Sequence, residues 1–513
     1  MRQPDRVSFG QALRVDTSAS FAQFVYPFTF ERQTFDARAS AVQQVAWSGR
    51  DRPLPVWERE TCPEHDLLAH VANYLRTDGD APATAAFWRM SHDAFHAVTG
   101  LGASADWTLT LPYGEIPIRL ESAQLVLFRI GVGFLTLRAR PMDAAVNTWL
   151  DFLHFFRFSR GRGGVRLKAR RRTGRDVSDA YFPEVAGGLG RHPEGSGELH
   201  ELLGACLDTA ALPGDGSGRW WSDVFVPGQL LPYCALFVDA APESELPELL
   251  YCLRNFFHSR QELRPTPAER DLEQQTSLLP YVAGQWFVFS LSGGAFAAAA
   301  APQTDFFRHT LPNHLLGEYF LVFLIALHQR FALISLSDDV ARAWLPAGAA
   351  GVERRRADAE HEKRRQAFPR ILDRLLLFTA RGYFAQIMQL EHHHRYYRKW
   401  QEIFQVDQMY AEVRDEVREM HDLVMAREAE DNRKQIEYLN VVAGALAAMI
   451  GGPLIVFGYS ALPEPRSGWE IPAALLGVAV VFALYAFFAL LLRTLARRTD
   501  TRSPGRGFDD GLP

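Results

Sequence analysis

The sequence is poor in the residues and patterns that most directly indicate a class of protein. Four cysteines occur in 513 residues and form no Cys-x-x-Cys pair, which argues against a disulfide scaffold and against the common zinc sites. Basic residues are not in excess, since the formal net charge is −5, so DNA is not an expected partner. The N-terminus, MRQPDRVSFG, has no apolar signal-peptide core.

Motifs of catalysis are also missing. No His-Glu-x-x-His, Gly-x-Ser-x-Gly, Walker or dinucleotide-binding pattern occurs in a supporting context. We therefore expect that the protein is not an enzyme and carries no organic cofactor. With 48% hydrophobic and 22% charged residues the composition is that of a globular protein, which excludes a carrier with many membrane spans.

Uncharged apolar runs are nevertheless present near the C-terminus. Residues 439–461 and 471–492 contain no charged side chain, and a helix needs about 20 apolar residues to cross a bilayer core. We predict two transmembrane helices joined as a hairpin by the short linker at 462–470. The mean hydropathy of −0.12 is thus an average over a polar region and this hairpin.

Basic residues lie at the two outer ends of the hairpin and are rare in its linker. Arg433 and Lys434 precede the first run, whereas Arg466 is the single basic residue of the linker. The second run is followed by Arg493, Arg497, Arg498 and Arg502. The positive-inside rule places both termini, including a basic tail at 493–513, in the cytoplasm. We expect a multi-pass protein of the cell inner (plasma) membrane, with the lipid bilayer as a partner.

A third apolar run lies at Tyr319–Leu327 and continues beyond a polar trio at 328–330. Glu318 at one end and this trio in the middle favour a buried amphipathic helix over a third span.

Residues 1–345 have the mixed pattern of an α+β protein, and we predict a cytoplasmic α/β domain there with one or two subdomains. Alternating apolar residues predict strands at 21–30, 107–111, 116–120, 125–130, 134–138, 231–238 and 286–291. Helical spacing predicts helices at 142–158 and 245–257.

Residues 346–438 are expected to form a helical stalk, with an apolar helix at 371–390 and one long helix from His392 to the membrane, since no Gly or Pro occurs before Gly444. Apolar residues recur in this helix at alternating spacings of four and three: Val406, Tyr410, Val413, Val417, Met420 and Val424. This is a coiled-coil-like seam, with an isolated amphipathic helix as the alternative. The charged stretch 427–437 that follows suits either a water-filled vestibule in an oligomer or a solvated stalk surface.

The strongest basic run extends from Arg157 to Arg175 and contains no acidic residue before Arg175. It is interpreted either as a mobile solvated loop or as a site for a small anionic or nucleotide ligand or for anionic lipid headgroups. The candidate binding residues are Arg160, Arg162, Arg166, Lys168, Arg170, Arg171 and Arg172.

Glu391 and His392 open a polar cluster, followed by His393 and His394. A regulatory metal site at Glu391 and His392 is a weak hypothesis, because adjacent residues on a helix point in different directions. A solvated cluster is one alternative. Packing of His392 with Tyr396 and Tyr397 beneath the soluble domain is another.

The order of a soluble α/β domain, a stalk helix, two spans with a short outside linker and a basic tail resembles the CorA-type divalent-cation (magnesium) channels. The resemblance covers the chain from residue 392 onward at the level of architecture. Those channels carry Gly-Met-Asn at the outer end of the first span, followed closely by Pro-Glu. Here the matching positions read Gly458-Tyr459-Ser460 and then Pro463-Glu464, so the glycine and the Pro-Glu pair match and the asparagine does not.

This resemblance implies a homopentameric channel for Mg²⁺ or a related divalent cation, gated by its cytoplasmic domain. The first span, rich in small residues that permit close helix approach, is the predicted pore lining, and Glu464 would lie at the outer mouth. The candidate lining residues are Asn440, Gly444, Ala447, Gly451, Gly458, Tyr459 and Ser460. Because Ser460 stands where the family has an amide, three alternatives stay open: a different ion, lower selectivity, or loss of transport.

Two other functions remain open on the sequence. One is a CorA-like membrane effector, as in bacterial defence, whose soluble domain binds a nucleotide-like signal and perturbs the membrane. The other is a non-conducting tether that anchors a cytoplasmic module.

Overall fold

The structure is a computed structural model that describes residues 9, 13–48, 53–61, 67–75, 83–98, 105–160, 166–171, 199–212, 215, 219–239, 245–260, 265–299, 304–344, 353–460, 479 and 486. The chain divides into two compact units, Met1–Arg418 and Glu419–Pro513. The predicted boundaries at residues 345, 438 and 492 are not tested by this division and stay predictions.

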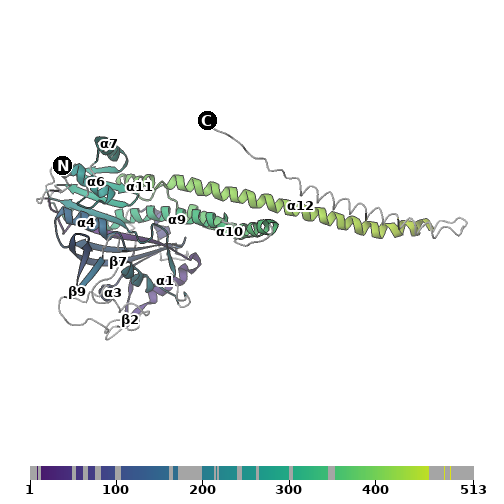
Figure 1. The fold of residues 1–513 in the computed structure, drawn as a ribbon, viewed down its shortest axis with the longest axis horizontal. Helices are drawn as coiled ribbons and strands as arrows, with labels where there is room; N and C mark the ends of the chain where they lie inside the picture. The colour runs from purple at the N-terminus through teal and green to yellow at the C-terminus, as the bar shows by residue number, and fades with distance from the viewer. Residues whose placement is uncertain are drawn as a thin grey trace. The chain divides into compact units, whose positions relative to one another are not determined.

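Within the described residues, the first unit is built on a twelve-stranded mixed sheet (Figure 1). Its main path runs β12 (Leu278–Val282), β13 (Gln285–Ser290), β14 (Gly293–Ala299), β11 (Leu231–Val238), β1 (Phe21–Phe30), β8 (Val132–Pro141), β7 (Gly114–Phe128), β5 (Ala85–Met90) and β4 (Trp57–Arg59). β10 (Trp221–Asp223) pairs with β1, and β6 (Ala105–Leu111) pairs with both β7 and β9 (Arg166–Arg171). β11 and β14 are parallel, whereas the other pairs are antiparallel.

The strands follow the alternation of the sequence closely. β1 and β11 have the predicted bounds, and the turn before β8 contains Gly131 at φ +92°, a conformation that favours glycine. The two strands predicted at 116–120 and 125–130 are instead one strand, β7, with an irregular register between Leu120 and Ser122. A bulge of this kind absorbs one extra residue without ending the strand, so a break in the alternation does not mark a turn.

One face of the sheet is covered by five helices: α1 (Phe35–Gln44), α3 (His92–Val98), α4 (Val146–Phe156), α5 (Leu199–Asp208) and α6 (Leu246–Asn255). The apolar face of α4 provides Trp149, Phe152 and Phe156, which are fully buried and belong to the main core. Phe24 of β1 contacts Phe152 edge-on, with ring centroids 5.4 Å apart. Burying such large rings contributes much of the core's apolar area. The predicted helices at 142–158 and 245–257 are therefore confirmed as α4 and α6.

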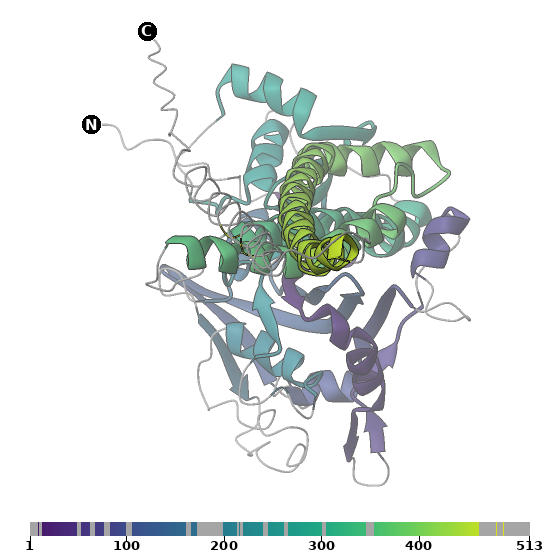
Figure 2. The ribbon, with the colours of Figure 1, turned by 90° about the vertical axis from the view of Figure 1, so that its right-hand side faces the viewer.

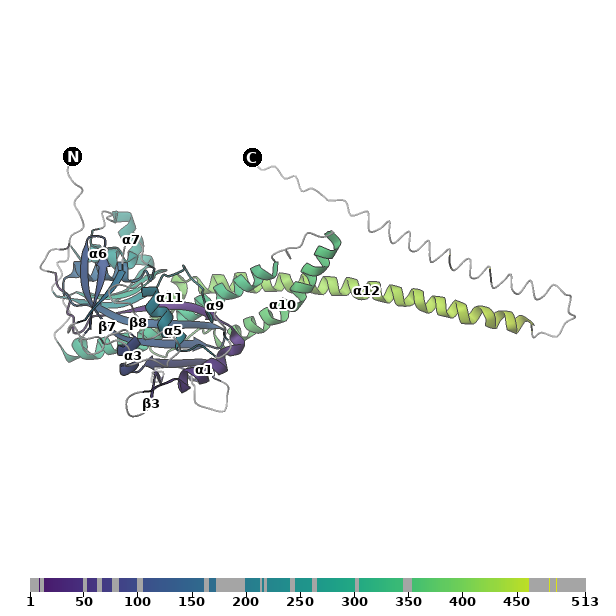
Figure 3. The same ribbon diagram turned by 60° about the horizontal axis from the view of Figure 1, so that its bottom comes forward.

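The other face is covered by α9 (Phe320–Trp344) and α11 (Glu391–Ile403), on the side of β7 and β8 opposite to α1, α3 and α5 (Figure 3). In Figure 2, the green helices that cover this face lie beside the purple and blue strands of the sheet. Phe331 of α9 contacts Phe134 of β8, and Phe323 stacks on Tyr233 of β11 with centroids 5.2 Å apart. Alternate residues of each strand thus fill two separate apolar layers.

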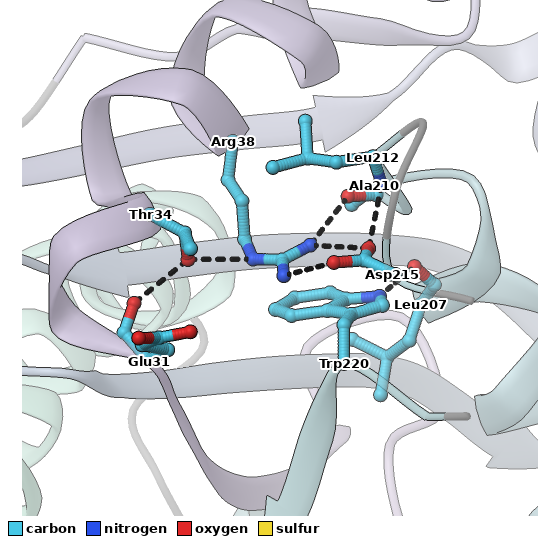
Figure 4. Close-up of polar contacts among 8 residues, drawn as sticks. All are labelled: Glu31, Thr34, Arg38, Leu207, Ala210, Leu212, Asp215 and Trp220. Carbon is cyan, nitrogen blue, oxygen red and sulfur yellow. Dashed lines mark hydrogen bonds and ion pairs between the residues drawn. The ribbon is translucent and has the colours of Figure 1, made fainter.

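A buried ion pair fastens α1 to the segment that follows α5 (Figure 4). Arg38, 2% exposed, donates two hydrogen bonds to Asp215, at 2.8 and 2.9 Å, and a third from Nε to Thr34 at 3.0 Å. Its guanidinium lies 4.2 Å from the ring centroid of Trp220. Asp215 also accepts from the backbone N–H of Leu212, and hydrogen bonding from Arg38 lowers the pKa of its carboxyl. A charge buried this deeply is tolerated because its donors are satisfied.

Candidate functional site

The segment that leads toward the predicted membrane spans begins at α11, which is held on the sheet by aromatic packing. Trp400 is 1% exposed, and its ring centroid lies 4.7 Å from Phe323, 4.8 Å from Phe289 and 4.9 Å from Phe404. A Cβ added at Gly294 would lie 2.5 Å from the Trp400 ring, so β14 has a glycine where this side chain approaches.

A buried polar network adds directional contacts between α9 and α11. Gln329 donates to the hydroxyl of Tyr397 at 2.8 Å and to the carbonyl of Gly382 at 2.9 Å. Gln401 donates to the same hydroxyl at 2.8 Å, and Tyr397 in turn donates to the carbonyl of Phe384 at 2.7 Å. Because buried polar groups are costly when unpaired, this network specifies one docking position for α11.

The long helix predicted from His392 is interrupted, which corrects that prediction. α11 ends at Ile403 and α12 (Val406–Ser460) begins three residues later. Gln405 between them has a φ of +53°, in the left-handed region, and Phe404 is buried against Trp400. A glycine usually occupies such a left-handed position. Here the burial of Phe404 stabilises the kink instead.

The predicted helix at 371–390 also ends early. α10 (Glu353–Arg381) stops before Gly382, whose N–H donates to the carbonyl of Phe378 at 2.7 Å, and Pro369 lies inside the helix. This glycine is an ordinary helix stop signal that the apolar pattern masked.

Five of the six residues of the predicted seam form a buried stripe on α12, and Tyr410 is half-buried. Val406, Val413, Val417, Met420 and Val424 are each at most 5% exposed, whereas the positions between them are exposed or half-buried. Near the start of the seam, Tyr410 stacks on Tyr383 with centroids 4.8 Å apart and contacts Phe378 of α10. At this point the seam is therefore covered by the same chain, as an amphipathic helix would be.

The charged stretch that follows is a helix without a buried side. From Met425 to Leu446, the described side chains are exposed or half-buried. Lys434 pairs with Glu430 at 2.7 Å and Arg433 with Glu437 at 3.2 Å, both one helical turn apart. Hydrogen bonding to Lys434 lowers the pKa of Glu430.

The backbone of α12 continues as helix through Ser460, which covers the first predicted span (Figure 1). Spacings of four, three, four and seven place Asn440, Gly444, Ala447, Gly451 and Gly458 on one helix face. Asn440 and Gly444 are exposed, and a Cβ at Gly444 would meet no atom within 4 Å. The side chains of Ala447, Gly451, Tyr459 and Ser460 lie outside the described part, as do Glu464 and, except for Ala479 and Ala486, the second predicted span.

Among the described residues, one helix is long and apolar enough to cross a membrane, Phe306–Trp344, which comprises η3 (Phe306–Thr310), α8 (Leu311–His314), η4 (Leu315–Tyr319) and α9. Of its most apolar window, 78% is buried inside the chain. That burial is the one expected of a core helix, and it agrees with the interpretation of the apolar run at Tyr319.

The basic run is partly ordered as a strand. Arg166, Lys168, Arg170 and Arg171 belong to β9, which pairs with β6 along its whole length, and Leu167 between them is 2% exposed. Arg160 is exposed just after α4, whereas Arg162 and Arg172 lie outside the described residues. The structure thus places four of the seven candidate residues on one strand.

The histidine cluster packs against the aromatic layer. In the part of the chain that the structure describes, no three His, Cys, Asp or Glu side chains are arranged to hold a metal ion. Glu391 and His392 are exposed at the start of α11, and His392 contacts the rings of Tyr281 and His393. Tyr396 and Tyr397 are buried beneath the sheet domain, as the packing alternative predicted.

The sequence did not predict a cavity of about 890 Å³ at the β12 edge of the sheet. Its walls are α6, α7 (Pro267–Thr276), β12 and β13, and apolar residues such as Leu250, Leu278 and Trp286 line it. Glu273 of α7 also lines it although its side chain is 3% exposed, and burial raises the pKa of this carboxyl to about 7.

Comparison with known proteins gives little further information. No family model matches the chain, and no curated protein matches it. Among solved structures, it is similar to the CorA magnesium transporter from Methanocaldococcus jannaschii, with 12% sequence identity and a TM-score of 0.19 over 52% of this chain and 92% of that one. A TM-score this low establishes neither a shared fold nor a shared activity.

Proposed function

We propose that this protein is a homo-oligomeric, CorA-like membrane channel for a divalent cation such as Mg²⁺, with a cytoplasmic regulatory domain. The observation that carries the proposal is α12, an unbroken helix that is buried on one side up to Val424 and then exposed all round as it enters an uncharged apolar run.

Exposed apolar side chains at the start of that run support the membrane location. Tyr438, Leu439, Val441 and Leu446 are between 41% and 70% exposed. Four such residues within nine positions of one helix exceed the scattered apolar residues of an ordinary surface. Lipid or neighbouring subunits would cover them, with Tyr438 at the bilayer interface.

The shared face of Asn440, Gly444, Ala447 and Gly451 supports a pore lined by the first span. Three of these residues are small, which lets several helices approach one axis closely. Two spans cannot enclose a pathway within one chain, so conduction requires several copies, and the family resemblance suggests five.

Ion flux into liposomes tests this proposal. Purified protein should carry Mg²⁺, Zn²⁺, Co²⁺ or Ni²⁺ down a gradient, followed with an entrapped indicator. Gly444→Leu should reduce flux strongly, because the space around Gly444 accepts the side chain in one chain but not where several helices converge. Ala445→Leu, which the helical spacing places away from the face of Asn440 and Ala447, is the matched control and should conduct.

The absence of flux for all four ions in wild-type liposomes would contradict the channel, as would equal flux in both leucine variants. Native mass spectrometry provides an independent measurement, since a monomer would favour the tether that anchors a cytoplasmic module without conducting.

A second candidate is the signal-responsive membrane effector, favoured by the ordering of four basic residues on strand β9. Its soluble domain would hold a nucleotide-like anion at this strand. Binding of labelled ATP that is lost in Lys168→Gln and unchanged in Lys399→Gln, a basic control on α11, would support it. Failure to retain any labelled nucleotide would count against it.

A further inference from the structure

The cavity beside α7 is open to solvent on one side and is lined mainly by apolar side chains. Leu246 and Leu250 contribute from α6, Leu278 and Pro280 from β12, and Trp286 from β13. Its volume of about 890 Å³ falls within the range of sites for small organic molecules, roughly 300–1,000 Å³. The walls come from one contiguous part of the first unit, so the cavity does not depend on the position of α12.

Two arginines and three glutamates meet at the junction of α6 and α7, and of these Arg270 and Glu273 line the cavity. Arg254 pairs with Glu269 at 2.6 Å, and Arg270 lies 3.7 Å from Glu248. These two arginines therefore each have a carboxylate partner. The third carboxyl, that of Glu273, has one oxygen, Oε1, that is buried without a hydrogen-bond partner among the described residues.

Such a group needs an explanation, because buried polar atoms are nearly always paired in native proteins. An unpartnered carboxyl in an apolar wall favours a partner that supplies a positive charge or a strong N–H donor. Burial also raises the pKa of Glu273 to about 7, so near neutral pH this carboxyl is only partly ionised. A cationic ligand would shift it toward the carboxylate and gain a charge-assisted hydrogen bond.

We propose that this cavity binds a small organic amine, with the protonated nitrogen at Glu273 and an apolar body between Leu250, Leu278 and Trp286. The two arginines pair with Glu269 and Glu248. Their charges lower the pKa of Glu273, but neither gives its Oε1 a hydrogen bond. This assignment is independent of the channel proposal, since it concerns binding by the sheet domain.

Ligand-observed NMR on the full chain in detergent tests the assignment with three matched probes. Phenethylamine carries the predicted cation on an aromatic body, 2-phenylethanol replaces the amine with a hydroxyl, and 3-phenylpropionate replaces it with an acid. We expect saturation transfer to phenethylamine with a Kd on the order of 1 mM or tighter, and at least tenfold weaker binding of the other two.

Two variants of α7 distinguish binding at this site from nonspecific binding to the protein or to detergent. Glu273→Gln removes the charge with little change of shape and should weaken phenethylamine binding by about tenfold or more. Asp271→Asn makes the same change of charge at an exposed position of the same helix and should bind as wild type does. Glu273→Leu provides a second test, and circular dichroism checks the fold of each variant.

Equal binding of the alcohol or the acid would overturn the proposal. So would phenethylamine binding that survives in both Glu273 variants, or no detectable binding by folded wild-type protein.

Discussion

The two parts of α12 have the same backbone and opposite environments. From Val406 to Val424, an apolar residue is buried or half-buried at every third or fourth position, whereas from Met425 to Leu446 the described apolar and charged residues alike are exposed or half-buried. The first part repeats the pattern of α11, where Trp400 is enclosed by aromatic rings. Among the described residues, contacts within the chain thus cover only the first part of α12.

This difference identifies residues 425–446 as the part of the molecule that needs lipid or neighbouring subunits around it. Helices in water take most of their stability from packing an apolar face, and residues 425–446 have no such face within the described chain. Ile436, Leu439 and Leu446 are at least 50% exposed. Changes in the first part should therefore alter folding, and changes in the second should alter membrane association or conduction.

The largest expected difference between the two parts comes from aromatic truncation. Trp400→Ala should destabilise the protein by about 3–5 kcal/mol, because it removes a fully buried ring and leaves a cavity. Tyr438→Ala, at a ring that is 70% exposed, should change the unfolding free energy by less than about 0.5 kcal/mol. Denaturant unfolding in detergent measures both, and equal losses would show that residues 425–446 are packed after all.

A charge introduced into each part should act in different ways. Val417→Asp places an unpaired carboxylate at a site that is 3% exposed and should cost about 3 kcal/mol of stability. Leu446→Asp should leave unfolding in detergent unchanged, yet it should oppose membrane insertion by about 2–3 kcal/mol. Carbonate extraction of membranes measures the second effect, and full retention of Leu446→Asp would argue against a span at 439–461.

Acid should destabilise the enclosed part through His328. This ring is 1% exposed and lies 4.1 Å from the Phe128 ring, and burial lowers its pKa to about 3. The unfolded chain binds a proton near pH 6.5 while the folded chain does not, so stability is present above pH 6.5 and is lost as the pH falls. Between pH 7 and pH 5 the loss attributable to this group is about 2 kcal/mol.

His328→Phe should remove that part of the acid sensitivity, whereas His421→Phe, at an exposed position of α12, should not. Unfolding curves at pH 7 and pH 5 give the comparison. An identical pH dependence in wild type and His328→Phe would show that His328 is protonated in the folded protein.

The smallest expected effect is at the exposed ion pairs. Glu437→Gln breaks the pair with Arg433, and the unfolding temperature should stay within measurement error because solvent-exposed pairs contribute little. Cation flux should be measured on the same variant. A reduced flux with unchanged stability would favour a vestibule at 427–437, and an unchanged flux would favour a solvated stalk surface.

Local sequence patterns predicted the elements whose apolar residues recur with the spacing of a strand or a helix. Alternation predicted β1, a short apolar run predicted β11, and spacings of three and four predicted the buried stripe from Val406 to Val424. Each depends on residues close in sequence, so the periodicity of side-chain burial is visible in the sequence itself.

Features that join distant residues were not predictable. The kink at Gln405 depends on burial of Phe404 against Trp400 and α9, with no Gly or Pro to indicate it. The cavity needs α6, α7, β12 and β13 together, and Arg38 and Asp215 are 177 residues apart. The pore residues were chosen by family resemblance, and the structure adds that five of them share one helix face.

The strands that flank β1 in the sheet are synthesised well after β1 itself. This strand is made early, yet its neighbours β8 and β11 end at Pro141 and Val238. At typical translation rates, roughly 10–40 s separate the emergence of β1 and β11 from the ribosome. During that interval the apolar stretch FAQFVYPFTF has an unpaired edge, which is the kind of segment that aggregates. Productive folding of this chain therefore depends on shielding its first strand until residues more than two hundred positions later arrive.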